Sequence, residues 1–280
     1  MTDPEVRYHM LRPGQVRQRR QACPIAYVPI GTIEWHGLHN PYGADTLQAE
    51  DLAILAARIG GGLAFPPLWY GESRVESLME ANAADRDRIA EGMGLSPDNF
   101  LPDRHPFAAS EQTLNYQRLL MHVLAEVESL GFTVAVLVAG HYPLVDHARA
   151  AATLFNRRQH SRAQRHGMLA WACVDYLLIA DRYRQAGDHA AGWETSHLLA
   201  NHPETVDLSL LPAKGAPIVG VGGKMPPQDA TAEFGRETLR AAAEVLVKEA
   251  HHRLENPDIY FRHGTGLCEG LWRQEGKAGT

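Results

Sequence analysis

The sequence has few cysteines and no long apolar run. Its 280 residues include three cysteines, Cys23, Cys173 and Cys268, which are far apart and form no C-x-x-C pair. An odd number of scattered cysteines indicates neither a disulfide framework nor a thiolate zinc site. No stretch approaches 18 apolar residues, and the polar, arginine-rich residues 2–21 lack the apolar core of a signal peptide. We therefore expect a cytoplasmic protein with no membrane partner.

The chain also has little excess charge, and two common catalytic motifs are missing. The net charge of −6 and the pI near 6.2 give no basic footprint for nucleic acid, so a small-molecule substrate fits better. Neither G-x-S-x-G nor a P-loop occurs, which leaves serine hydrolase and nucleotide-binding functions without support. With 45% hydrophobic residues and no linker, we expect a single domain over residues 1–280. Its core covers about residues 24–250, and residues 256–280 form a C-terminal extension.

What the chain does contain is a regular alternation of strand and helix patterns. The helical pattern at 113–130 is expected to bury Leu114, Leu119, Leu120 and Leu124. Continuous apolar runs such as 132–139 are typical of strands that are buried on both faces of a parallel sheet. This rhythm predicts an α/β fold with a mainly parallel sheet and helices on both faces. The expected strands are 23–30, 63–65, 132–139 and 168–174. The expected helices are 46–59, 113–130, 143–155, one that follows the cluster at 188–196 and runs through Leu199, and one that starts at Thr238.

Polar side chains with metal-ligating chemistry follow the first predicted strand. Glu34, His36 and Asp45 form the pattern E-x-H-x8-D. In an extended segment Glu34 and His36 point the same way, and the turn-forming residues between 37 and 43 allow Asp45 to return to the same point. A mixed nitrogen and oxygen set suits zinc, manganese or iron(II) better than calcium. The alternative is a polar loop in which the two carboxylates make ordinary ion pairs and helix caps.

Two further segments add candidates at the ends of other elements. His141 follows the strand at 132–139, and ligands gather at the carboxyl ends of parallel strands. In the cluster at 188–196, His189 beside Asp188 is a candidate general base or acid, and Glu194 is a candidate metal ligand. The alternatives are a structural histidine at 141 and helix capping by Asp188 or Thr195.

These segments together resemble the creatininase (creatinine amidohydrolase) family. The resemblance rests on P-I-G-T-I-E-W-H-G at 29–37 with G-A-D-T at 43–46, G-H-Y at 140–142, D-H-A-A-G-W-E-T-S at 188–196, and G-V-G followed by A-T-x-E-x-G within 220–235. The order of the motifs is that of the family. The resemblance implies a three-layer α/β/α hydrolase with two divalent metal ions per subunit (Zn, Mn or Fe). It also implies a homo-oligomer, with a hexamer favoured.

The resemblance implies roles for individual residues as well. Glu34, Asp45 and His141 would hold one metal, and His36 and Asp45 would hold the other, with Asp45 as the bridge. His189 matches the family histidine that moves a proton. Creatininase has G-H-Y-E-N with a glutamate ligand, whereas this chain has Pro143 and Leu144 at the last two positions. Either Glu194 or water supplies the missing ligand, or only one metal binds tightly.

The expected reaction is the opening of a small cyclic amide or related carbonyl substrate by attack of a metal-bound water. His189, oriented by Asp188, would donate the proton to the leaving atom. Ser73 in the long segment 69–107, Tyr142 and Trp193 are the candidate substrate contacts. One alternative is hydrolysis of a C–C bond in a cyclic diketone, as in the inositol and sugar branch of the family. A second alternative is a binding scaffold without catalytic activity.

Overall fold

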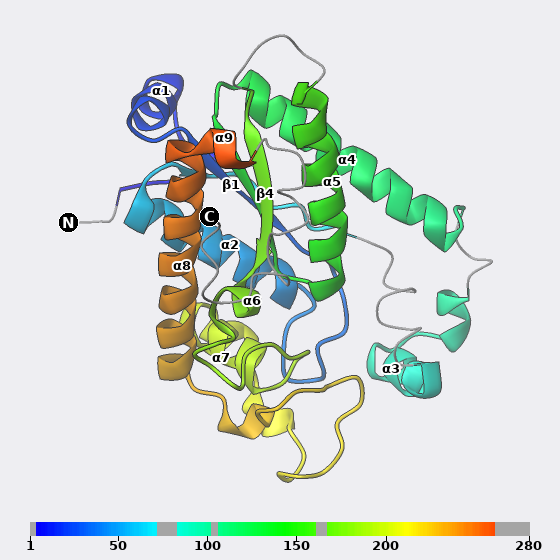
Figure 1. The fold of residues 1–280 in the computed structure, drawn as a ribbon. Helices are drawn as coiled ribbons and strands as arrows, with labels where there is room; N and C mark the ends of the chain where they lie inside the picture. Colours follow the sequence, from blue (N-terminus) through cyan, green and yellow to red (C-terminus); the bar gives the residue numbers. More distant parts are fainter. Residues whose placement is uncertain (1–3, 72–82, 102–105, 161–166, 261–280) are drawn as a thin grey trace.

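The computed structural model describes residues 4–71, 83–101, 106–160 and 167–260. Its centre is a four-stranded parallel sheet with the order β2-β1-β3-β4 (Figure 1). The strands are β1 (Ile25–Ile30), β2 (Leu63–Ala64), β3 (Val134–Ala139) and β4 (Leu169–Val174). Ile30 pairs with Ala139, and Ala139 pairs with Val174, so three strands end at the same level of one sheet edge.

Helices cover both faces of this sheet because the strand side chains alternate between two cores. Ala26, Val28 and Ile30 of β1 pack on one face, and Ile25 and Tyr27 pack on the other. The first face is covered by α4 (Ala109–Ser129) and α5 (Tyr142–His160), and the second by α2 (Ala44–Gly60) and α8 (Ala232–Glu255). The predicted three-layer α/β/α fold with a mainly parallel sheet is confirmed.

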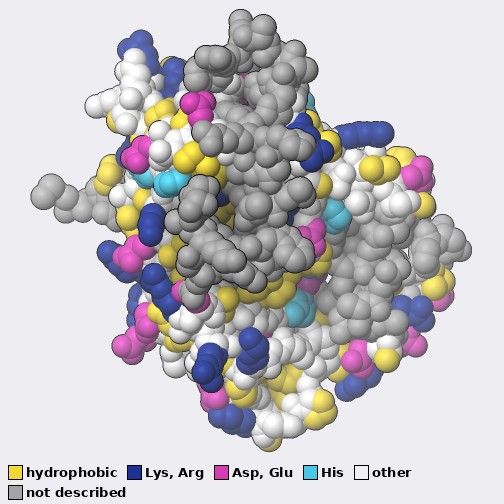
Figure 2. Space-filling model, viewed as in Figure 1, with side chains coloured by type: hydrophobic (Ala, Val, Ile, Leu, Met, Phe, Trp, Pro, Cys, Tyr) yellow, Lys and Arg dark blue, Asp and Glu magenta, His cyan; other side chains and the backbone are white. Residues whose placement is uncertain are grey.

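Smaller elements surround these layers. The helices α6 (Asp175–Ile179) and α7 (Gly192–Asn201) follow β4, and α7 packs against α8. The remaining helices are α1 (Pro13–Ala22), α3 (Arg86–Gly92) and α9 (Pro257–Tyr260), and 3-10 turns lie at Tyr8–Met10, Ala83–Asp85, Pro97–Phe100, Pro203–Thr205, Leu208–Leu210 and Pro227–Asp229. Within the described ranges, no helix has the length and apolar character needed to cross a bilayer. On the face in Figure 2, described lysines and arginines are interspersed with aspartates and glutamates.

Two helices differ from their predicted form. In α4, Leu120 and Leu124 are buried as predicted, but Leu114 and Leu119 are 51% and 41% exposed, because the helix covers the sheet with a narrower apolar stripe. The last long helix begins at Ala232, six residues before the predicted start. Its N-cap is Thr231, whose hydroxyl accepts a hydrogen bond from the Phe234 amide at 3.2 Å. Of the C-terminal extension, only residues 256–260 lie in the described ranges.

Candidate metal centre

A cluster of carboxylates and imidazoles forms where β1 and β3 end. Glu34 and His36 follow β1, Asp45 lies in the first turn of α2, and His141 follows β3. Glu194 comes from the first turn of α7. The side chains of these five residues are 7% exposed or less, so the cluster is shielded from water. The parallel sheet and two helix N-termini therefore bring together residues that are up to 160 positions apart.

The local backbone explains how the first two residues reach the cluster. Glu34 and His36 both point into it, whereas Trp35 points away and packs with Ile89 and Phe100. The Trp35 indole N–H donates to the Val219 carbonyl at 2.9 Å, which holds the ring on that side. The predicted alternation of side chains after β1 is thus present, although the strand itself ends at Ile30.

A close backbone contact brings His141 beside Asp45. A Cβ on Gly140 would lie 1.8 Å from the Asp45 carbonyl oxygen, so only glycine allows the segment after β3 to approach α2 this closely. His141 Nδ1 then lies 3.1 Å from both Glu34 Oε2 and Asp45 Oδ2. These three residues form the first candidate ligand group.

A second ligand group shares Asp45 with the first. His36 Nε2 lies 3.1 Å from Asp45 Oδ1 and 3.4 Å from Glu194 Oε2. Asp45 therefore turns one carboxylate oxygen to each group. A third combination consists of Glu34, His36 and His189, with His189 Nδ1 3.1 Å from Glu34 Oε1. In each group the potential ligand atoms lie within 4.8 Å of one another.

The polar atoms of the cluster fit divalent cations. Glu34 Oε2 and Asp45 Oδ2 are fully buried, yet neither accepts a hydrogen bond of ordinary geometry from the described residues. Buried carboxylate oxygens without donors are costly, and a bound cation would satisfy both. The nitrogen and oxygen donors match the preferences of zinc, manganese or iron(II). The residues present thus fit divalent metal binding, in overlapping groups of candidate ligands.

The electrostatics of the cluster spread its pKa values apart. Burial raises the pKa of Glu34 to about 7, against the opposing effect of His141. Burial disfavours the charged form of Asp45 too, but His36 and His141 outweigh it and hold the pKa of Asp45 well below its usual range. Burial lowers the pKa of His189 to about 3, and His36 adds to this. Strongly perturbed neighbours of this kind are typical of functional sites.

Asp188 has a different role from the one expected. Its Oδ2 accepts a hydrogen bond from the Trp193 amide at 2.6 Å, and its Oδ1 lies 3.3 Å from the amides of Ala191 and Glu194. The carboxylate therefore caps the N-terminus of α7, where backbone N–H groups lack partners. His189 is oriented instead by Glu34 and by the Trp35 carbonyl, which accepts its Nε2–H at 2.9 Å.

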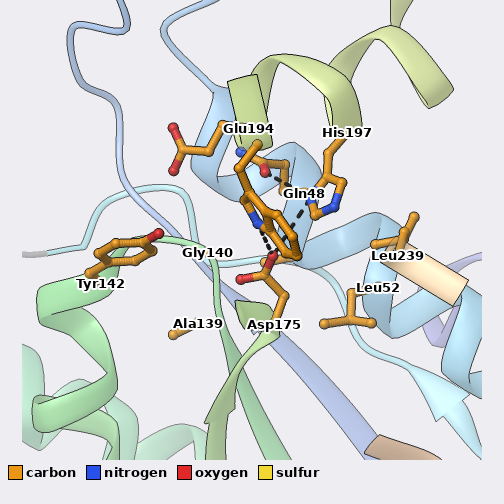
Figure 3. Close-up of a pocket in the computed structure, with 11 residues that line it drawn as sticks. Gln48, Leu52, Ala139, Gly140, Tyr142, Asp175, Glu194, His197 and Leu239 are labelled. Carbon is orange, nitrogen blue, oxygen red and sulfur yellow. Dashed lines mark hydrogen bonds and ion pairs between the residues drawn. The ribbon is translucent and has the colours of Figure 1, made fainter. Parts of the chain in front are cut away.

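Of the three candidate substrate contacts, Trp193 and Tyr142 lie in the described part of the chain. Trp193 is 1% exposed, and its indole N–H donates to Asp175 Oδ2 at 2.7 Å. It lines a cavity of about 10 Å³ together with Tyr142 and Glu194, both labelled in Figure 3, and this cavity holds at most one water. Trp193 is thus held by packing and by its hydrogen bond to Asp175, and its contact with substrate stays a prediction. The Tyr142 hydroxyl is buried and has no hydrogen-bond partner among the described residues, and Ser73 lies outside them.

Sequence reasoning missed one residue beside the cluster. His39 is 2% exposed, and its Nε2 lies 3.0 Å from the Ala190 carbonyl oxygen. It stands three positions after His36, within the segment that carries the first ligands. A second histidine in this segment was the available signal, but spacing does not say which histidines turn toward an ion.

The fold and the cluster together define an α/β protein with a candidate metal centre at the carboxyl edge of its sheet. The family model for creatinine amidohydrolase matches residues 9–250. The chain therefore belongs to the creatininase family.

Individual relatives agree with this assignment. A mutant creatininase of Zn-Zn type has a TM-score of 0.65 at 20% identity, covering 91% of this chain and 99% of that one. A manganese form of creatininase has a TM-score of 0.65 at 19% identity, covering 91% of this chain and 100% of that one. The 3-dehydro-scyllo-inosose hydrolase of Thermotoga maritima is 35% identical over 57 residues. That match spans 20% of this chain and 18% of the Thermotoga enzyme.

Proposed function

We propose that this protein is a metal-dependent hydrolase that holds two divalent cations in overlapping ligand groups. The observation that carries the proposal is the position of Asp45, whose Oδ2 faces His141 and whose Oδ1 faces His36, each at 3.1 Å. Two-metal hydrolases hold their ions about 3.5–4 Å apart, a separation that one shared carboxylate spans. Glu34, Asp45 and His141 would hold one cation, and His36, Asp45 and Glu194 the other.

Glu194 supplies the ligand for which Pro143 leaves no side-chain donor. Pro143 lies in the first turn of α5, where its missing N–H costs nothing, but its ring cannot coordinate a metal. Glu194 Oε2 lies 3.4 Å from His36 Nε2 in the buried cluster. This geometry favours two cations over the alternative of one tightly bound ion.

When bound, the cations would polarise a substrate carbonyl and lower the pKa of a water toward ~7. The proton is handled by His189. Because a carbonyl only accepts, the contact with the Trp35 oxygen places a hydrogen on Nε2, and Nδ1, which lies 3.1 Å from Glu34 Oε1, is the nitrogen that is left to take a further proton. The His189 side chain is 28% exposed, whereas the five ligands are 7% exposed or less, so it lies on the side that substrate reaches. His189 takes a proton at Nδ1 and returns it to the leaving atom.

The substrate class follows from the family and from one relative. Creatinine amidohydrolases open a C–N bond, so a small cyclic amide or related carbonyl compound is the first candidate substrate. The local match to 3-dehydro-scyllo-inosose hydrolase supports a second candidate, hydrolysis of a C–C bond in a cyclic diketone. Both reactions need a polarised carbonyl and a proton for the leaving atom. We also propose a homo-oligomer, with a hexamer favoured, to be checked by analytical ultracentrifugation.

The first test is the metal content of protein purified without a histidine tag or added metal. We expect about two ions per chain in the wild type and a sharp loss in Asp45→Asn. Asp51→Asn is the matched control, because it removes a carboxylate from the same helix. The Asp51 carboxylate contacts His202 and lies outside the ligand groups. Equal metal content in Asp45→Asn and the wild type would overturn the proposal and favour a binding scaffold.

The second test concerns the reaction. Lactams, formamides and cyclic diketones are screened with the metal-loaded enzyme, and the products distinguish C–N from C–C cleavage. His189→Asn should keep the wild-type metal content and lower kcat by about 10²–10⁴-fold. Loss of metal in this variant would instead make His189 a ligand, as its proximity to Glu34 and His36 also allows.

A further inference from the structure

The starting observation is a histidine that is buried beside the metal centre but belongs to none of the candidate ligand groups of the described residues. His39 Nε2 lies 3.0 Å from the Ala190 carbonyl oxygen. Because that oxygen can only accept, Nε2 carries a hydrogen, and burial lowers the pKa of His39, which disfavours the charged ring. The ring also packs on Gly37, where an added Cβ would lie 2.7 Å from it.

The partner of His39 has an unusual backbone. Ala190 has φ +55°, the only positive value among the described non-glycine residues. An L residue seldom adopts this left-handed conformation, and it persists only where the surroundings hold it. Ala190 is fully buried between His189 and the start of α7, so its conformation sets the direction of both segments.

The other backbone group of Ala190 reaches the metal centre. Its N–H donates to Glu194 Oε2 at 2.7 Å. The same oxygen lies 3.4 Å from His36 Nε2 in the second ligand group. A continuous series of contacts therefore runs from His39 through Ala190 to Glu194 and back to His36, three residues before His39.

We infer that His39 is a positioning residue for the second metal site. Its Nε2–H holds Ala190 in the left-handed conformation, and the Ala190 N–H then fixes the Glu194 carboxylate toward the cation shared with His36 and Asp45. This inference rests on the proposed two-cation function. His39 belongs to neither ligand group, so its removal would weaken the site of His36, Asp45 and Glu194 and leave the site of Glu34, Asp45 and His141 intact.

The experiment measures the two binding steps for Mn²⁺ in competition with a chromophoric chelator. His39→Leu removes the donor at similar volume, and His39→Gln keeps an N–H at the position of Nε2. We expect His39→Leu to weaken the second step by about 10–100-fold, as loss of an outer partner does, while the first step is unchanged. His39→Gln should recover most of the second step. The exchange-coupled EPR signal of two neighbouring manganese ions should follow the same order.

A rescue variant separates positioning from general damage. Glycine adopts positive φ without a steric cost, so Ala190→Gly should lessen the need for His39. Adding Ala190→Gly to His39→Leu should restore part of the second binding step. His202→Gln is the matched control: His202 pairs with Asp51 Oδ2 at 2.9 Å and lies outside the ligand groups, so its loss should leave both steps intact. If His39→Leu does not fold, His39→Asn serves instead, since its shorter amide cannot reach Ala190.

Each result of these binding experiments either supports the inference or overturns it. Selective loss of the second step, with recovery in His39→Gln or on addition of Ala190→Gly, supports the inference. Wild-type binding in His39→Leu, equal weakening of both steps, or loss without any rescue overturns it. A wild-type protein that binds fewer than two manganese ions refutes the two-cation function and this inference with it, which is recognisable before any variant is made.

Discussion

His36 and Glu194 meet in the buried cluster, with His36 Nε2 3.4 Å from Glu194 Oε2. The contact joins the segment after β1 to the first turn of α7, across 158 positions of the chain. Ligand groups built from separate elements depend on the fold, because neither segment alone holds enough donors for an ion. The contact also explains how a chain with proline at position 143 can retain a second metal site.

Glu194→Gln should therefore remove one cation and keep the other. The amide is nearly isosteric but carries no charge, so we expect the second cation to bind at least about tenfold more weakly. Metal analysis and Mn²⁺ titration check this. Glu34→Gln is the matched comparison and should weaken the first site instead, since Glu34 faces His141 at 3.1 Å. Loss of both ions in Glu194→Gln would contradict the division into two groups.

Asp188→Ala should destabilise the protein because Asp188 caps α7. Three backbone N–H groups would lose their acceptor in a buried setting, at a cost of about 2–3 kcal/mol. Urea unfolding measures the free energy, and Asp181→Ala at an exposed position should change it by less than about 0.5 kcal/mol. If Asp188 acted through His189 instead, Asp188→Asn would lower kcat while stability stayed unchanged.

Gly92→Ala should disturb the metal centre through Trp35. A Cβ at Gly92 would lie 2.5 Å from Trp35 Cη2, and overpacking of this kind costs about 1–3 kcal/mol. The shift of Trp35 should also reach Glu34 and His36, so metal affinity should fall with stability. In Gly14→Ala, an exposed position in α1 with no atom within 4 Å of the added methyl, we expect a gain of up to about 1 kcal/mol. Equal unfolding free energies for the two variants would be the contrary result.

The His202–Asp51 pair should make stability depend on pH. The hydrogen bond to Asp51 at 2.9 Å raises the pKa of His202, against the effect of burial, and Glu204 and Glu50 act in the same direction as Asp51. Because the folded pKa lies above the unfolded value of about 6.5, the stabilisation is full below that pH and is lost as pH rises through the folded pKa. The pair contributes no more than about 1 kcal/mol.

Unfolding free energies of the wild type and His202→Gln check this prediction. The difference between them should be larger at pH 5.5 than at pH 9, because titration of all other groups cancels in the comparison. The contrary finding is a difference that stays constant or grows with rising pH.

Several parts of this protein were predictable from the sequence because their signals are local. Apolar runs such as 132–139 report burial on both faces of a sheet, and the turn residues around Gly37 and Gly43 report a chain reversal toward Asp45. The ligand candidates Glu34, His36, Asp45, His141 and Glu194 come together in the structure as a result. The exposed Leu114 and Leu119 show the limit, since helical periodicity does not say how wide a stripe the neighbouring layer covers.

The sequence by itself determined the alternating α/β architecture and which residue types could hold a metal, because side-chain chemistry and short-range periodicity depend only on the identity and local spacing of the residues. The tertiary structure alone decided which contacts those residues make. It turned Asp188 toward α7 and away from His189, buried Trp193 against Asp175, and connected His39 to Glu194 through Ala190. The physical reason is that hydrogen bonds between distant segments depend on distances and directions of a few tenths of an ångström, which only the packed layers set.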